Sequence, residues 1–138
     1  MRSSKQLRWR AQRGQAMIET GLMIIIMAMV SFFIFELGEL LYTYSVMANA
    51  ANEGVRYAIV QSGAGDANGT TKARVKNFAT TSMHDVSAIT VTVSAPDGSY
   101  TPPNRVRVTL SYVYVPYLPK FMNSPTMTTY AEGRMVAP

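Results

Sequence analysis

A chain of 138 residues that contains one long apolar helix leaves room for a single small domain of roughly 80 to 100 residues. The formal net charge of +5 is concentrated at the start, since five of the 13 basic residues precede Gly14 and all eight acidic residues follow it. The remainder is neutral, which excludes a nucleic-acid partner because such binding needs a basic face on the folded domain. Without cysteine, the domain is expected to be held together by its core and not by disulfides.

The apolar run at residues 21–35 is expected to form a membrane-spanning helix. Its Leu, Ile, Val and Phe side chains favour transfer into lipid by on the order of 3 to 5 kcal/mol in total. Glu19 lies just before this run, and an ionisable residue in a membrane tends to face protein and to have a partner. Basic residues before the run and none just after it place the N-terminus in the cytoplasm and the C-terminal domain outside.

The residues around Gly14 can supply a partner for this carboxylate. A cut between Gly14 and Gln15 would free an α-amine four residues before Glu19. This pattern resembles the prepilin-peptidase site of type IV pilins and pseudopilins, although Thr20 stands where that family usually has an aromatic residue. The resemblance implies that Gly14 ends a leader, that Gln15 carries the new amine, and that Glu19 neutralises an amine during assembly. A plain signal anchor, left uncut, is the competing interpretation.

One continuous helix is expected from Ala16 to about Val60, because no proline and no turn cluster interrupts this stretch. It is expected to be membrane-spanning first and amphipathic after Glu36. In the second part, apolar residues recur at spacings of three and four: Leu37, Leu41, Tyr44, Ala48, Ala51, Val55 and Ala58. Glu53 and Arg56 are spaced to form an ion pair within the helix. The small residues of the stripe are expected to let the downstream sheet approach closely.

The second part of this helix also contains an ordered series of residues: Asn49, Ala51, Glu53, Gly54, Arg56 and Tyr57. The series resembles the Asn-Ala-Ala, Glu-Gly and Arg-Tyr-Ala motifs that follow the membrane helix in the TadE-like family, over about residues 13 to 60. Members of that family are pseudopilin or minor-pilin components of the Tad (Flp, tight adherence) pilus and secretion machinery. The implied partners are prepilin peptidase, other pilin or pseudopilin subunits, Tad inner-membrane assembly proteins and membrane lipid. An ordinary amphipathic helix is the competing interpretation.

The remainder of the chain is expected to complete an α+β fold, with a short second helix and a small antiparallel sheet of about three strands packed on the long helix. Thr70 or Thr71 is expected to cap the second helix, which continues to about Ser82. Alternating apolar and polar residues predict three strands, at residues 89–94, 105–114 and 126–136. The first two are expected to form a hairpin with a long tip that contains prolines.

These elements predict three parts of the chain: a basic leader at 1–14, a transmembrane helix at 15–36 and an extracytoplasmic domain at 37–138. An apolar segment at residues 115–122 cannot continue the second strand through its two prolines. Its residues Tyr117, Leu118 and Phe121 are candidates for an interface with a partner subunit or with lipid, or else the segment packs beneath the domain.

Residue types that would indicate an enzyme are scarce. His84 is the single histidine and cysteine is absent, so neither a hydrolytic triad nor a structural zinc site is expected. No catalytic residue, cofactor, metal or small-molecule substrate is therefore predicted. The favoured hypothesis is a processed pseudopilin-like subunit in a bacterial inner membrane. An uncut single-pass scaffold with an exported interaction domain is the alternative, and a membrane-tethered enzyme or ligand-binding module is the least favoured.

Overall fold

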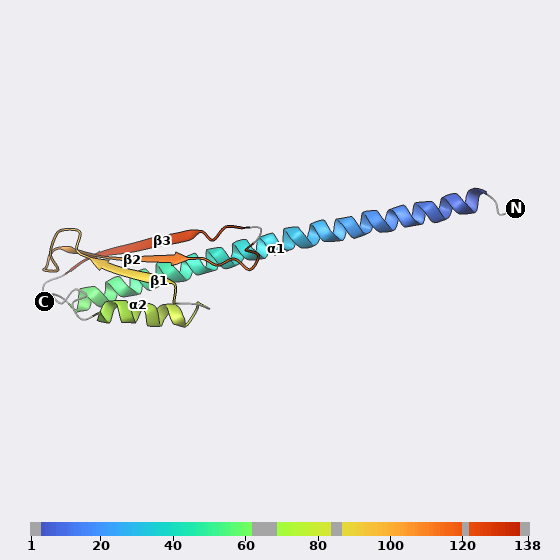
Figure 1. Ribbon diagram of the computed structural model, residues 1–138. Helices are drawn as coiled ribbons and strands as arrows, with labels where there is room; N and C mark the ends of the chain where they lie inside the picture. The colour runs from blue at the N-terminus through green and yellow to red at the C-terminus, as the bar shows by residue number, and fades with distance from the viewer. Residues whose placement is uncertain (1–3, 62–68, 84–86, 120–121, 136–138) are drawn as a thin grey trace. The chain divides into compact units, whose positions relative to one another are not determined.

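The computed structural model describes residues 4–61, 69–83, 87–119 and 122–135, with the side chains of residues 4–13 outside this description. Figure 1 shows the helices α1 (Ser4–Val60) and α2 (Thr70–Thr80) and the strands β1 (Ile89–Ser94), β2 (Arg105–Val113) and β3 (Thr126–Arg134). The chain divides into two compact units, Met1–Gly38 and Glu39–Pro138, and α1 contributes to both. The α+β fold class expected from the sequence is confirmed.

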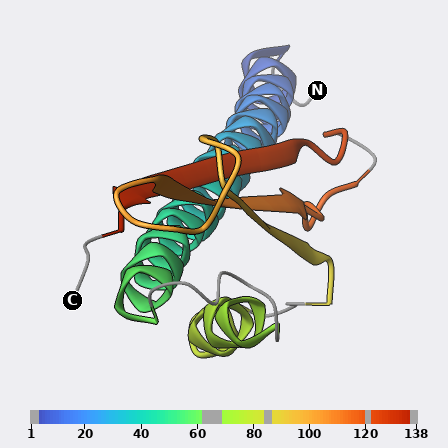
Figure 2. The same ribbon diagram turned by 90° about the vertical axis from the view of Figure 1, so that its left-hand side faces the viewer.

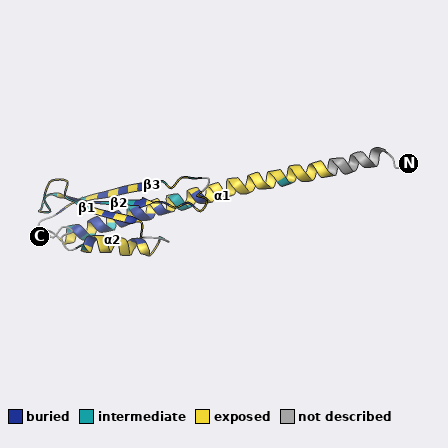
Figure 3. Ribbon diagram, in the orientation of Figure 1, coloured by how far each residue is buried: buried dark blue, intermediate teal, exposed yellow. Residues whose placement is uncertain are grey.

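The first unit consists of the N-terminal part of α1 with its apolar side chains exposed. From residue 14 to residue 35 the side chains are exposed throughout, except that Gly21 is partly covered (Figure 3). Among the described residues, α1 is the one helix long and apolar enough to cross a membrane. The helix begins at Ser4, well before the expected start at Ala16, because the residues before Gly14 include good helix formers and no proline.

The strands of the second unit form an antiparallel sheet in the order β1-β2-β3, so each strand pairs with the next one along the chain (Figure 2). Every second residue of β2 is buried: Val106, Val108, Leu110 and Tyr112. This pattern arises because successive side chains of a strand point to opposite faces of the sheet. The expected hairpin of the first two strands is confirmed, and the third strand ends at Arg134, before the expected end at Val136.

The core of the second unit lies between one face of the sheet and the two helices. Buried residues come from α1 (Met47, Ala50, Ala51, Val55, Ala58), from α2 (Val75, Ala79) and from all three strands. The buried side of α1 differs from the expected apolar stripe, since Leu41 and Tyr44 are exposed and Thr43 is buried. Small residues fix which side of the helix meets the sheet, and Leu41 and Tyr44 lie to one side of that contact.

Helix α2 packs against β1 and starts differently from the prediction. Its N-cap is Gly69, at φ 69° and ψ 7°, and no side chain caps the helix. The expected cap by Thr70 or Thr71 is wrong, because Thr71 is fully buried in the first turn and packs inside the domain. Glycine suits the N-cap position since it adopts a positive φ without steric penalty.

Candidate functional site

The two residues of the expected processing site, and the glutamate expected to pair with the new amine, are exposed along α1. Gly14, Gln15 and Glu19 are all exposed, and a Cβ built on Gly14 would find no atom within 4 Å. Residues four apart lie on the same side of a helix, so an amino group at Gln15 would be one turn away from the carboxylate of Glu19. Among the described residues, nothing around Gly14 requires a glycine.

The series that resembles the TadE-like motifs divides between two sides of α1. Ala51 and Gly54 are buried, Glu53 and Tyr57 are partly buried, and Asn49 and Arg56 are exposed. A Cβ on Gly54 would collide with Cγ2 of Val75 in α2 and would lie 3.2 Å from Cγ1 of Val108 in β2. Gly54 is thus the point where α1, α2 and the sheet meet, and the absence of a side chain permits this approach.

A second glycine contact fixes the other end of the same interface. In the sequence, Gly133 interrupts the pattern of the third strand without an obvious reason. In the structure, a Cβ on Gly133 would lie 2.5 Å from Cδ1 of Ile59 and 2.6 Å from Cγ1 of Val55. The side chains of α1 occupy the space that a residue other than glycine would need, so β3 packs closely on the helix.

The ion pair expected between Glu53 and Arg56 is wrong. Glu53 Oε1 instead accepts a hydrogen bond of 3.2 Å from Nη2 of Arg74 in α2, while Arg56 is exposed. A partner at i,i+3 was suggested by helix spacing alone, whereas the real partner depends on how α2 folds back on α1. Exposed pairs of this kind contribute about 0 to 1 kcal/mol, so this one adds little to the packing of Val75 and Ala79 that holds α2 on the domain.

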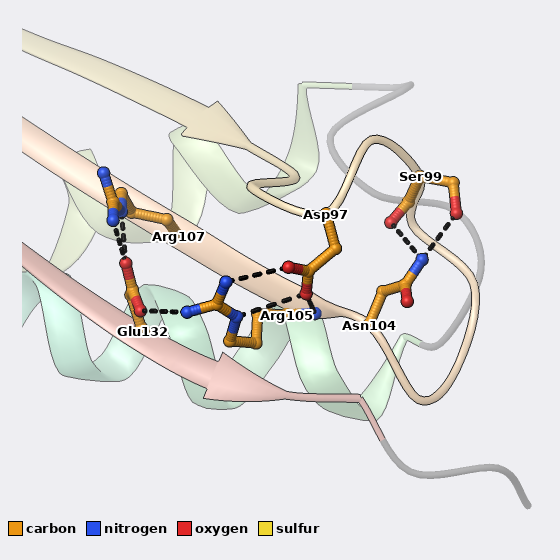
Figure 4. A network of polar contacts seen from close by, with 6 residues as sticks. All are labelled: Asp97, Ser99, Asn104, Arg105, Arg107 and Glu132. Carbon is orange, nitrogen blue, oxygen red and sulfur yellow. Dashed lines mark hydrogen bonds and ion pairs between the residues drawn. The ribbon is translucent and has the colours of Figure 1, made fainter.

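A network of charged residues, which sequence reasoning missed, links the β1–β2 connection to β2 and β3 (Figure 4). The Asp97 carboxylate accepts bonds from Arg105 Nη2 at 2.8 Å, from Arg105 Nε at 3.2 Å and from the Arg105 backbone N–H at 2.8 Å. Glu132 pairs with Arg105 Nη1 at 3.5 Å and also with Arg107. Arg107 and Glu132 are directly opposite each other in the pairing of β2 with β3. A correct prediction of that strand register would therefore have predicted this ion pair.

The network has a clear electrostatic consequence at the domain surface. Hydrogen bonds from the Arg105 side chain, and then from its backbone N–H, lower the pKa of Asp97 from its ordinary value of 3.8 to about 2. The same side-chain bond and the charges of Asp97 and Glu132 raise the pKa of Arg105. Arg107 in turn lies 5.0 Å from the ring centroid of Tyr130. These groups satisfy one another, and their arrangement fastens the β1–β2 connection to the sheet.

The apolar segment after β2 is partly exposed and partly buried. Tyr117 and Leu118 are exposed and Pro116 is buried, while Phe121 lies outside the described residues. The backbone N–H of Tyr114 donates a 3.0 Å bond to the carbonyl of Pro125, which closes the base of this connection. The exposure of Tyr117 and Leu118 favours an interface over burial beneath the domain. Among the described residues no group of His, Cys, Asp and Glu could hold a metal ion, and His84 lies outside them.

Comparison with known families identifies a match to part of this chain. The family model described as TadE-like protein matches residues 14–56. The matched segment begins at Gly14, contains Gln15 and Glu19, and ends at Arg56, so Tyr57 alone of the helical series lies beyond it. Neither the curated proteins nor the solved structures contain a match to this chain. The resemblance found from the sequence is confirmed over this segment.

Proposed function

We propose, from the match of residues 14–56 to the TadE-like family, that this chain is a non-enzymatic pseudopilin-like or minor-pilin-like subunit of a Tad (Flp) pilus machinery. This match is the main support for the proposal because the matched segment contains four features that are each common alone: a glycine at the end of a basic leader, a glutamate, an apolar helix and the series from Asn49 to Arg56. The length and composition of α1 support a single-pass membrane protein. The bacterial inner membrane, with the second unit outside the cytoplasm, is the location that fits these features.

The first step of the proposed function is proteolysis by prepilin peptidase. Hydrolysis of the bond between Gly14 and Gln15 adds water across it, leaving a carboxylate on the leader and an amine on Gln15. The exposure of both residues supports access by the enzyme. A Cβ at Gly14 would meet no atom of the described residues within 4 Å, so the need of the peptidase for a small residue before the cut supplies a reason for this glycine.

The second step is assembly, in which Glu19 provides a negative charge near the new amine. A buried or intramembrane charge without a partner is strongly unfavourable, and an opposite charge within hydrogen-bond reach offsets much of that penalty. The partner amine belongs either to the same chain, four residues upstream, or to a neighbouring subunit. The exposed apolar side chains of α1 then lie against lipid and against the helices of other pilin or pseudopilin subunits.

The second unit supports a structural role for the exported domain. Its charged network is internally paired, and the small residues of α1 are used to pack the domain on its own helix. We therefore propose that neither a cofactor nor a small-molecule substrate takes part. Recognition of other Tad proteins falls to exposed parts of the helix and domain.

N-terminal sequencing of the protein extracted from membranes, combined with identification of the proteins purified with it, tests this function. We expect a chain that begins at Gln15 and co-purifies with pilin-type subunits or Tad inner-membrane proteins. Gly14→Leu should leave the chain uncut. The matched control Gly21→Leu changes another glycine of α1 at which a Cβ would meet no described atom within 4 Å, and this variant should still be cut. A working protein that begins at Met1 in cells containing the peptidase would reject processing and favour the uncut scaffold.

A further inference from the structure

Two groups of exposed apolar side chains lie in the second unit, in segments far apart in the sequence. One group is on α1 just after Glu39, and the other is in the connection between β2 and β3. Together they are Leu41, Tyr42, Tyr44, Val115, Tyr117 and Leu118, and are referred to below as the apolar rim. Their exposed fractions range from 43% for Leu118 to 68% for Tyr117. Such a concentration of exposed apolar side chains marks a contact surface more often than chance exposure.

The two groups lie at the same end of the domain. The direction of β2 relative to α1 follows from two contacts. Val106 pairs with Gly133, which is close to Val55 and Ile59 of α1, whereas Val108 is close to Gly54. As β2 proceeds, it therefore runs toward lower residue numbers of α1. Figure 1 shows the same opposite directions. At about 1.5 Å per helical residue, Leu41 is about 20 Å from Gly54 along α1. At about 3.3 Å per strand residue, the end of β2 near Tyr114 is also about 20 Å from Val108.

Chain connectivity brings this end of the domain close to the membrane. The apolar run ends at Phe35, and Leu41 follows six residues later in the same helix, a rise of about 9 Å. The headgroup region on each side of a bilayer is about 5 to 8 Å thick, from the difference between total and hydrocarbon thickness. When residues 16–35 span the hydrocarbon, the short link between Phe35 and Leu41 therefore keeps Leu41 and Tyr42 close to the headgroups.

The chemistry of the rim suits this position. Tyrosine combines an apolar ring with a hydroxyl that bonds to water or lipid, and it is enriched where membranes meet water. Three of the six rim residues are tyrosines. We propose that the apolar rim lies in the headgroup region of the membrane that holds α1, so that the domain rests on the lipid surface. This inference depends on the membrane anchoring in the proposed function and is independent of processing.

Tryptophan fluorescence in vesicles tests the proposal with the full chain. Trp9 is the single tryptophan, so Trp9→Phe provides a silent background. In that background, Tyr117→Trp and Val115→Trp each place a fluorescent probe in the rim. The variants are reconstituted in phosphatidylcholine vesicles whose lipids carry bromine, a quencher of tryptophan emission, near the headgroup end of the acyl chains. Interfacial groups penetrate about 5 to 10 Å, so we expect bromine to remove about half of the emission of either probe.

Two further variants make the result decisive. Tyr130→Trp places a probe at an exposed position within β3, where we expect little quenching. Phe32→Trp places one in the apolar run, where we expect strong quenching. If Phe32→Trp is quenched while both rim probes behave like Tyr130→Trp, the domain does not rest on lipid and the proposal is wrong, although the anchor stands.

The remaining outcomes also overturn the proposal. Rim emission that changes with the protein-to-lipid ratio but not with bromine would show that a second copy of this chain covers the rim. An unquenched Phe32→Trp probe would mean that α1 does not insert, which removes the basis of this inference and of the membrane anchor together. N-terminal sequencing remains a separate measurement, so failure here and failure of the processing proposal are distinguishable.

Discussion

Gly14 and Gly54 belong to the same helix but to different units, and their surroundings contrast completely. A Cβ added at Gly14 would meet no atom of the described residues within 4 Å, whereas a Cβ added at Gly54 would collide with Val75 and press on Val108. The apolar side chains near Gly14 are exposed, whereas the small residues near Gly54 are buried. The contrast teaches that the apolar side chains of residues 17–35 have no cover within the described residues, whereas the second unit covers its own core.

The largest expected effect comes from Gly14→Leu, which tests this contrast at its outer end. We expect cleavage to be abolished while the second unit keeps its melting temperature, because Gly14 lies outside that unit and a Cβ there meets no described atom within 4 Å. Immunoblotting of membranes for precursor and mature chains, with circular dichroism of the extracted protein, measures both. A large fall in melting temperature would show that Gly14 serves the fold after all.

Glu19→Ala tests whether the first unit serves assembly after processing. We expect this variant to be cut and inserted but to recover at least about tenfold less pilin-type partner in pull-downs, since removing one charge of a desolvated pair costs about 3 to 5 kcal/mol. Glu39→Ala, which removes a carboxylate beyond the apolar run, serves as the control and should assemble normally. Equal recovery of partners with both variants would refute the role of Glu19.

Gly54→Ala tests the close packing of α1 on α2 and the sheet in the second unit. We expect the second unit to lose about 1 to 3 kcal/mol of unfolding free energy, because the added methyl group overpacks the junction of α1, α2 and β2. Gly38→Ala is the matched control, since a Cβ there has no atom within 4 Å and alanine is the better helix former by about 1 kcal/mol. Thermal unfolding of the full chain in detergent micelles should separate the two variants. Identical melting curves would contradict the close contact.

The smallest expected effect is a dependence of the domain's stability on pH, caused by Asp97. The folded-state pKa of Asp97 is about 2 and its ordinary value is 3.8, so its contribution to stability is complete above about pH 4 and disappears as the pH falls toward 2. Asp97→Asn should therefore lower the melting temperature slightly at pH 7 and converge with the original protein near pH 2. Melting temperatures of both proteins between pH 7 and pH 2 provide the check. A constant difference across this range would exclude Asp97 as the titrating group.

The strands and the existence of both helices could be predicted because each depends on local pattern. Alternation of apolar and polar residues located the starts of β1, β2 and β3 at Ile89, Arg105 and Thr126. Gly14, Gln15 and Glu19 were proposed from their spacing along one helix, and their roles in processing and assembly stay predictions.

Features that depend on packing between elements were not predictable in the same way. The buried side of α1 was misjudged because Thr43 and Tyr44 are neighbours in the sequence and only the position of the sheet decides which is covered. Arg74 could not be assigned to Glu53 without knowing how α2 returns to α1. The meaning of Gly133 likewise depends on Val55 and Ile59, which precede it in the chain by more than seventy residues.

The order of the sheet determines when this domain can finish folding. Synthesis runs from the N-terminus, so α1 exists first and the hairpin of β1 and β2 can pair as soon as residue 113 is available. The side of α1 near Val55 and Ile59 stays uncovered until Gly133 arrives on the final strand. A chain stopped short of β3 would expose that surface to whatever protein is nearby, so the pairing of β3 is the closing step of the domain.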